Sequence, residues 1–311
     1  MVRVAMKKSS ISLFVGGAVL IVAAMIVVFV VLNNPPAAHP SSDKLRIAAT
    51  IHPLANIISQ VGGSYVDVQT ILPPGASPHT FEPTPEQIRN LQGTKLIFSI
   101  GHGLDNWVKL LADNVPNATS VVMDQGIKLR DLPADQIDPD IPNENVDPHY
   151  WLDVSNAKIM SQDIASYLAQ KDPTHQTEYA NNLSAYLGQL DKLNAEIKNQ
   201  LRDLSHKELI THHNAWGYFA DAYGLKIVGT FEISPGKEPT PQQIADLQTK
   251  VKTYNVQMIF SEPQLSEQSL IPFVQDLKLK IAVLDPEGGL KNMGYIDLMR
   301  YNTGVIADAL K

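Results

Sequence analysis

The chain has 311 residues, with 32 acidic against 25 basic side chains, a formal net charge of −7 and no cysteine. A cysteine-free chain has no disulfides, no thiolate metal ligands, no cysteine nucleophile and no cysteine for lipid attachment. The acidic balance argues against nucleic acid as a partner and is compatible with attracting a cation. The length suits two domains of ordinary size.

An uncharged apolar run occupies residues 11–32. As a helix rising about 1.5 Å per residue it reaches roughly 33 Å, enough to cross a bilayer core of about 30 Å. Three basic residues precede this run, so the positive-inside rule places the N-terminus in the cytoplasm and the rest outside. We predict an uncleaved transmembrane anchor at 1–32, with a cleaved signal peptide as the alternative. A Pro/Ala/Ser-rich tether is expected at 33–44.

The rest of the chain alternates between strand and helix patterns. The expected strands are residues 46–51, 65–72, 95–100 and 119–123 in the first half, and 208–211, 226–231, 256–260 and 281–284 in the second. The expected helices are residues 55–61, 85–92, 104–114, 214–223, 241–253, 266–277 and 293–310. This alternation predicts parallel sheets covered on both faces, with ligands bound beyond the carboxyl ends of the strands.

One heptapeptide pattern, Glu-Pro-Thr-Pro-x-Gln-Ile, occurs at residues 82–88 and again at 238–244. Each copy continues into a Leu-Gln pair and then an apolar run ending in Ile-Phe-Ser. Proline suits the first helical position, and the preceding threonine can cap the helix. The repeat therefore predicts two similar α/β lobes, with a ligand site in the cleft between them.

Between the lobes, apolar residues recur every three or four positions from about Thr174 to Leu204. This spacing predicts one long amphipathic helix. We expect it to connect a first lobe at 45–173 to a second lobe at 205–311, whereas a coiled-coil dimer helix is the alternative. The predicted fold is thus α/β, with two pseudo-symmetric lobes of mostly parallel sheets joined by one long rigid helix (174–204), plus the N-terminal transmembrane helix.

Histidine and aspartate residues stand where predicted strands or strand-like runs end. Neutral imidazole and carboxylate are good ligands for a borderline divalent cation, and three nitrogens with one oxygen suit tetrahedral Zn²⁺. Their spacing of about 70 residues leaves open which of them bind a metal. The candidates are His79, His149, the pair His212 and His213, and Asp285.

Four segments carry a resemblance to a known family. They are Pro78-His79-Thr80-Phe81-Glu82-Pro83-Thr84-Pro85, Asp147-Pro148-His149-Tyr150-Trp151-Leu152-Asp153, His213-Asn214-Ala215-Trp216-Gly217-Tyr218-Phe219 and Leu284-Asp285-Pro286. In this order they resemble the zinc/manganese-binding substrate-binding proteins of ABC importers, from about residue 45 to the C-terminus. The resemblance implies two α/β lobes joined by a long helix, with a metal held between them.

Carried over position by position, the resemblance implies the metal ligands His79, His149, His213 and Asp285. Manganese-selective relatives tend to have a carboxylate where this chain has His213, and three imidazoles favour Zn²⁺ over Mn²⁺. We therefore expect a zinc receptor, with Mn²⁺ as the alternative ion. It would act as a monomer on the extracytoplasmic face of the membrane and deliver the ion to an ABC permease and ATPase complex.

Other histidines and acids have weaker claims to the site. His212 is an alternative to His213, although it points to the opposite side of an extended chain. His52 and His102 are expected to support ligands or cap helices. Glu82 and Asp153 are candidates for orienting a ligand imidazole, with helix capping as the alternative role for each.

A zinc hydrolase would need an open coordination position and a general base. The sequence contains no His-Glu-x-x-His motif, so an enzyme is not expected. A metal-dependent adhesin or sensor remains an alternative. Metal binding is expected to weaken as pH falls through the imidazole range near about 6.5.

Overall fold

The computed structural model describes residues 44–137 and 145–311. Residues 45–311 form one compact unit. The predicted anchor at 1–32 lies outside the described residues. Within the described part, no helix combines the length and apolar character needed to span a bilayer.

Two four-stranded parallel sheets form the framework, and both have the same topology. The first sheet has the order β2-β1-β3-β4 and the second β6-β5-β7-β8. Both orders put the first strand of each half second in its sheet, so the halves are related as the repeated heptapeptide predicts. The strands are β1 (Leu45–Ala49), β2 (Val66–Thr70), β3 (Leu96–Ser99), β4 (Thr119–Val122), β5 (Glu208–His213), β6 (Lys226–Glu232), β7 (Met258–Ser261) and β8 (Lys280–Val283).

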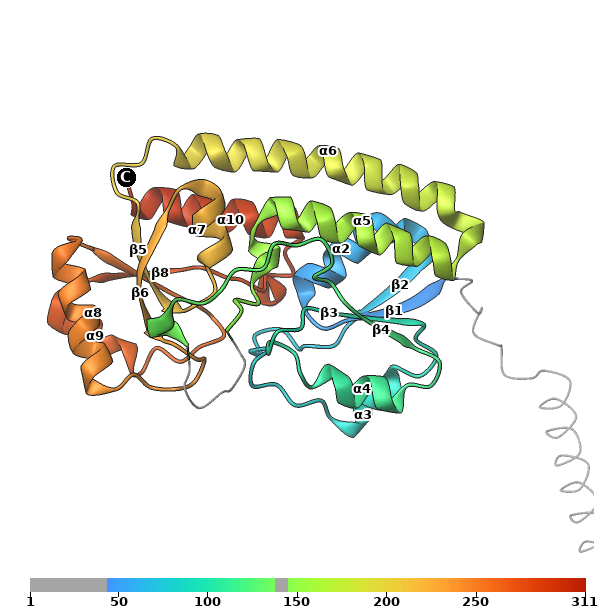
Figure 1. Cartoon of the computed structure of the whole chain (residues 1–311), viewed down its shortest axis with the longest axis horizontal. Coiled ribbons are helices and arrows are strands. Elements are labelled where there is room, and N and C mark those ends of the chain that lie inside the picture. Colours follow the sequence, from blue (N-terminus) through green and yellow to red (C-terminus); the bar gives the residue numbers. More distant parts are fainter. Residues whose placement is uncertain (1–43, 138–144) are drawn as a thin grey trace, which may run out of the picture. The chain divides into compact units, whose positions relative to one another are not determined.

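Helices connect the strands and cover the sheets (Figure 1). Three of them, α5, α6 and α10, lie together along one side of the unit, and α3 and α4 lie on the other side of the first sheet. The helices are α2 (His52–Gly62), α3 (Pro85–Asn90), α4 (Val108–Asn114), α5 (Val154–Lys171), α6 (Gln176–Leu201), α7 (Gly217–Tyr223), α8 (Pro241–Thr253), α9 (Leu270–Leu277) and α10 (Tyr295–Ala309).

The repeated heptapeptide begins α3 in the first half and α8 in the second. In each copy the threonine hydroxyl accepts a hydrogen bond from the glutamine backbone N–H at 3.3 Å, for Thr84 with Gln87 and for Thr240 with Gln243. The glutamine side chain returns the bond by accepting from the threonine N–H, at 2.9 and 2.7 Å. Each copy is thus a complete capping box, which satisfies two otherwise unpaired backbone donors.

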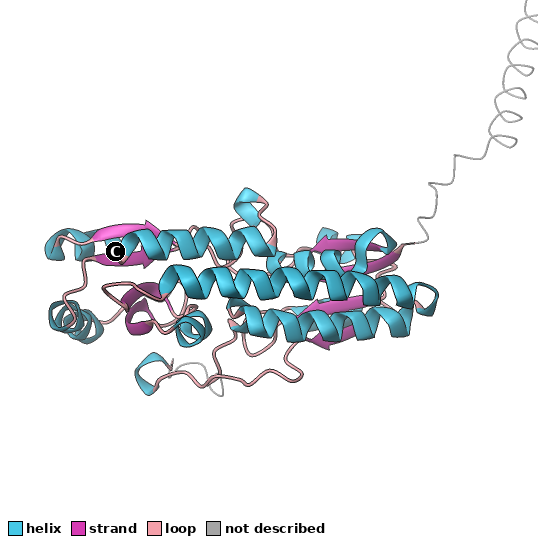
Figure 2. Ribbon diagram, turned by 90° about the horizontal axis from the view of Figure 1, so that it is seen from above, coloured by secondary structure: helices cyan, strands magenta, loops and turns pink. Residues whose placement is uncertain are grey.

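The long helix predicted at 174–204 is α6, and it packs on both halves. It contacts α2 and α5 on one side and α7 and α10 on the other. Figure 1 shows it above α5 and α10, and Figure 2, which is seen from above, shows the two sheets towards its opposite ends. Its apolar stripe is buried within this one chain, at Tyr179, Tyr186, Leu190, Leu193, Ile197 and Leu201. One hydrophobic core therefore extends from Ile47 in β1 to Leu310 at the end of α10.

Helix α5 was not predicted from the sequence. Its buried face includes two polar residues, Asn156 and Ser161, which interrupt the apolar periodicity. Both side chains hydrogen-bond to backbone carbonyls, Asn156 to Tyr150 at 3.1 Å and Ser161 to Ala157 at 2.6 Å. Because local partners satisfy these buried groups, the helix tolerates them at core positions.

Candidate metal centre

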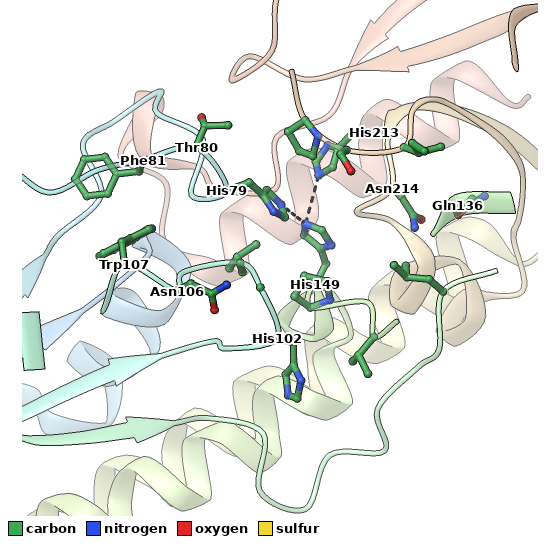
Figure 3. Close-up of a pocket in the computed structure, with 18 of the residues that line it drawn as sticks. His79, Thr80, Phe81, His102, Asn106, Trp107, Gln136, His149, His213 and Asn214 are labelled. Atoms are coloured by element: carbon green, nitrogen blue, oxygen red, sulfur yellow. Dashed lines mark hydrogen bonds between the residues drawn. The ribbon is translucent and has the colours of Figure 1, made fainter. Parts of the chain in front are cut away.

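Three histidines from separate parts of the chain meet at one point. His79 lies in the loop between β2 and α3, His149 just before the short 3₁₀ turn Tyr150–Leu152, and His213 is the last residue of β5. The Nε2 atom of His149 lies 3.2 Å from Nε2 of His79 and 3.3 Å from Nε2 of His213. Figure 3 shows the three rings directed towards one another, with His149 in the middle.

These separations fit a tetrahedral metal ion. With Zn–N bonds of about 2.0–2.1 Å, the ligand nitrogens of a tetrahedral site lie about 3.3–3.4 Å apart. The two measured edges, 3.2 and 3.3 Å, are close to that value. Candidate ligand atoms of all three residues lie within 4.8 Å of one another. The three imidazoles are thus already spaced for one ion.

Two buried carboxylates fix which ring nitrogen of His149 and His213 carries the proton. Asp147 Oδ1 lies 2.9 Å from Nδ1 of His149, and Glu262 Oε2 lies 2.8 Å from Nδ1 of His213. A carboxylate at Nδ1 keeps the proton there, which leaves a lone pair on Nε2. Two bare Nε2 atoms about 3.3 Å apart repel each other, and a cation between them removes the repulsion.

Other side chains hold these two carboxylates in place. Arg130 donates from Nη1 to Asp147 Oδ2 at 3.3 Å, and the indole N–H of Trp216 donates to Glu262 Oε1 at 3.1 Å. Gly217 leaves room for this pair, because a Cβ atom there would lie 2.5 Å from Arg130 Nη1 and 2.6 Å from Asp147 Oδ2 and would displace them. The Trp-Gly pair of the His213 motif therefore supports both ligand-orienting carboxylates.

The sequence did not indicate Asp147 and Glu262 as orienting residues, and it left Glu82 and Asp153 open between orienting a ligand and capping a helix. Asp153 caps α5 by accepting from the backbone N–H of Ser155 at 2.7 Å, and Glu82 is exposed. One signal could have identified the correct pair. Asp147 stands two residues before His149, and Glu262 directly follows β7, next to the strand that ends at His213.

The other predicted candidates lie outside the group of three. The ring of His212, on the opposite side of β5, approaches Glu232 Oε1 at 3.3 Å. His52 Nε2 lies 2.9 Å from the carbonyl oxygen of Met293, and His102 Nε2 lies 2.9 Å from Asp124 Oδ2. His102 lines the same pocket but is separate from the three rings (Figure 3).

Asp285, the fourth predicted ligand, is not part of the group of three histidines. Its Oδ1 atom accepts three hydrogen bonds, from Gln264 Nε2 at 2.9 Å and from the backbone N–H groups of Glu287 at 3.0 Å and Gly288 at 2.9 Å. Asn302 pairs with the backbone of Asp285 on both its N–H and C=O. Asp285 therefore builds the turn after β8, and its Oδ1 atom already carries three donors.

Two cavities adjoin the three histidines. An open pocket of about 490 Å³ reaches them from outside and is lined in part by Phe81, Trp107 and Asn214. A second, very small cavity of about 10 Å³ is lined by the same histidines together with Glu262 and Glu287. About one water-sized sphere fits in such a volume. The three histidines thus line both cavities.

Burial and neighbouring charge give the three histidines different proton affinities. Burial, together with repulsion from the other imidazoles, holds the pKa of His79 and His149 well below the usual value. Burial also opposes a charge on His213, but the attraction of Glu262 outweighs it and raises its pKa. A proton therefore competes with a metal first at His213.

We expect this order to be visible in the metal-free protein. As pH falls, His213 should charge above about pH 6.5, whereas His79 and His149 should stay neutral until well below it. Zinc affinity should accordingly begin to fall above pH 6.5. Histidine NMR titrations, assigned with single His→Gln variants, measure each pKa. Glu262→Gln should shift the His213 titration to lower pH, and charging of His79 before His213 would contradict the expectation.

Comparison with known proteins identifies the family. A family profile described as zinc-uptake complex component A, periplasmic, matches residues 47–309. The chain belongs to this family. Its members are substrate-binding proteins of metal ABC transporters for zinc or manganese, not enzymes. The resemblance noted in the sequence is thus confirmed at this level.

Relatives in the family are named for different metals. The chain is 28% identical over 287 residues to the high-affinity zinc uptake system protein ZnuA of Bacillus subtilis, covering 88% of this chain and 90% of the relative. It is 30% identical over 286 residues to the manganese ABC transporter substrate-binding lipoprotein PsaA of Streptococcus mitis, covering 87% and 90%. A crystal structure of ZnuA superposes with a TM-score of 0.78 at 29% identity, covering 86% of this chain and all of that one.

Proposed function

We propose that this protein captures Zn²⁺ outside the cytoplasm and delivers it to an ABC importer. The observation that supports this most directly is the convergence of three histidine Nε2 atoms. In two of the histidines a carboxylate, Asp147 or Glu262, contacts Nδ1 and so leaves the lone pair on Nε2 available for a metal. His79, His149 and His213 are the proposed nitrogen ligands. The fourth is an oxygen from the turn after β8, where the sequence predicts Asp285.

The chemistry of the donors favours zinc over manganese. Three imidazoles suit Zn²⁺, whereas Mn²⁺ prefers oxygen donors and a higher coordination number. Bare affinity follows the Irving–Williams order, which also places Zn²⁺ above Mn²⁺. The name of the manganese relative keeps Mn²⁺ as the second candidate.

A competition experiment tests the choice of metal. Protein purified without chelator and then stripped is titrated with each ion against a chromophoric chelator, and with Mn²⁺ in the presence of Zn²⁺. We expect Zn²⁺ to bind at least about 100-fold more tightly than Mn²⁺, because of the three nitrogen ligands. Equal affinities, or displacement of bound zinc by micromolar Mn²⁺, would count for the manganese alternative.

Delivery to a transporter follows from membership in the family. We propose that the partners are a permease and its ATPase, and that the receptor works as a monomer on the extracytoplasmic face. Deletion of the gene should slow growth in zinc-depleted medium, and added zinc should restore it. A deletion strain that grows normally at limiting zinc would argue against a role in uptake and favour an adhesin or sensor.

A further inference from the structure

Arg130 connects the segments that carry two of the three histidines. Its guanidinium donates from Nη1 to Asp147 Oδ2 at 3.3 Å and from Nε to Asp221 Oδ2 at 2.9 Å. Asp147 lies two residues before His149, and Asp221 lies in α7, the helix that follows His213 at the end of β5. The side chain therefore bonds to the first half of the chain with one nitrogen and to the second half with another.

The backbone of Arg130 is held at the same two places. Its N–H donates to the Tyr218 hydroxyl at 2.7 Å, and its carbonyl accepts from the Asp147 N–H at 2.9 Å. Tyr218 also belongs to α7, so main chain and side chain both join the Asp147 segment to that helix. Four contacts on one residue leave these two segments little freedom to move apart.

The contact between Arg130 and Asp147 lies in a less exposed place than the contact with Asp221. The Asp147 side chain is fully buried, whereas that of Arg130 is 22% exposed and that of Asp221 is 66% exposed. A buried carboxylate needs a cation and hydrogen-bond donors to stay in place. Asp147 Oδ1 accepts from the His149 backbone N–H at 3.0 Å and contacts its Nδ1, and Oδ2 accepts from Arg130.

We infer that Arg130 is a positioning residue that fixes the spacing of His149 and His213 and so sets how tightly and how long zinc is held. The two Nε2 atoms lie 3.3 Å apart, and the two rings come from different halves of the chain. A bridge between their supporting segments keeps this separation before the ion arrives. The inference rests on the proposed function, because it assumes that the three histidines hold the ion.

Arg130→Gln is the direct test, and the sign of its effect separates geometry from charge. Removing a positive charge near the site would by charge alone favour a bound cation. If Arg130 positions the ligands, zinc affinity should instead fall about 10–100-fold, the usual cost of losing an outer partner of a ligand. Chelator competition measures the affinity. Stopped-flow mixing with excess EDTA measures zinc dissociation, which should be faster by a similar factor. Unchanged or tighter binding in R130Q would overturn the inference.

A double-mutant cycle tests whether Arg130 acts through Asp147. Asp147→Asn removes the carboxylate that contacts His149. If Arg130 works through this carboxylate, the R130Q/D147N double variant should bind zinc within about 2-fold of D147N alone. A separate structural role for Arg130 would add its full loss to that of D147N, and this result would contradict the inference.

Two further variants serve as matched controls. Arg130→Lys keeps the charge but not the planar fork that reaches two carboxylates. Its zinc affinity should fall by at least about 3-fold, less than in R130Q, and R130K carries the test if R130Q does not fold. Arg202→Gln removes an exposed arginine paired with Asp203 and should leave zinc affinity within about 2-fold of wild type. A loss in R202Q as large as that in R130Q would indicate a general charge effect and contradict the inference.

Metal-free protein gives a readout that does not depend on zinc. In the wild type the His149 proton should stay on Nδ1, facing Asp147, and nitrogen NMR of the imidazole detects this. R130Q should change the His149 ring signals and leave those of His52 as they are. A folded R130Q with unchanged His149 signals would also overturn the inference. Failure of the wild-type protein to bind zinc would instead reject the proposed function, so the two failures can be told apart.

Discussion

Replacing His79 and His149 together with alanine is expected to lower zinc affinity by at least about 100-fold, since loss of an outer partner of a ligand alone costs about 10–100-fold. The double substitution removes two of the three nitrogens, and with them both measured Nε2–Nε2 distances, and leaves only the His213 ring in place. Isothermal titration calorimetry or chelator competition at pH 7.5 measures the loss.

His206→Ala is the control for the double variant. His206 is exposed and lies between α6 and β5, outside the group of three histidines. We expect zinc affinity within about 2-fold of wild type in this control, because an exposed imidazole without a second ligand binds metal weakly. Retention of tight binding by the double variant, with a normal circular dichroism spectrum, would rule out the proposed site.

Trp151→Ala should produce the largest loss of stability. Trp151 is fully buried, its indole N–H donates to the Pro286 carbonyl at 3.0 Å, and its own carbonyl accepts from the Tyr295 hydroxyl at 2.7 Å. It thus connects the first half to two segments of the second. Removing a buried tryptophan side chain typically costs about 3–5 kcal/mol in the free energy of unfolding.

Urea unfolding of metal-free protein measures this change. Leu110→Ala, at a side chain that is 48% exposed, serves as the control and should change the free energy of unfolding by no more than about 0.5 kcal/mol. Trp151→Phe should fall between the two, because it keeps an aromatic ring and leaves the Pro286 carbonyl without its donor. A loss below about 1 kcal/mol for Trp151→Ala would show that the two halves are held together elsewhere.

Much of the framework was predictable because its signals are local. All eight strands appear close to the predicted ranges, and the α3 and α8 helices begin where the Thr-Pro pairs indicate. Helix α5 was not predicted, because its buried polar residues Asn156 and Ser161 interrupt the apolar periodicity that marks a buried helix face. The predicted domain limits at 173 and 205 remain predictions.

The candidate site was predictable only in part. The motifs indicated His79, His149 and His213, and these three converge. The orienting roles of Asp147 and Glu262 depend on contacts across the fold that no sequence spacing encodes. Asp285 follows β8 as predicted, but the three hydrogen bonds that its Oδ1 atom accepts depend on the fold of the turn and could not be predicted from the sequence.

The continuous core beneath α6 bears on how such a receptor reports that it is loaded. A hinge motion that moved the two halves apart would separate side chains that pack in one core, from Ile47 to Leu310. Such a large opening is therefore strongly disfavoured. The zinc-free and zinc-bound forms of residues 45–311 should therefore have nearly the same dimensions. A transporter would then have to recognise the loaded protein through the ordering of the short segments that bear His79 and His149. Small-angle scattering with and without zinc should give almost superimposable curves.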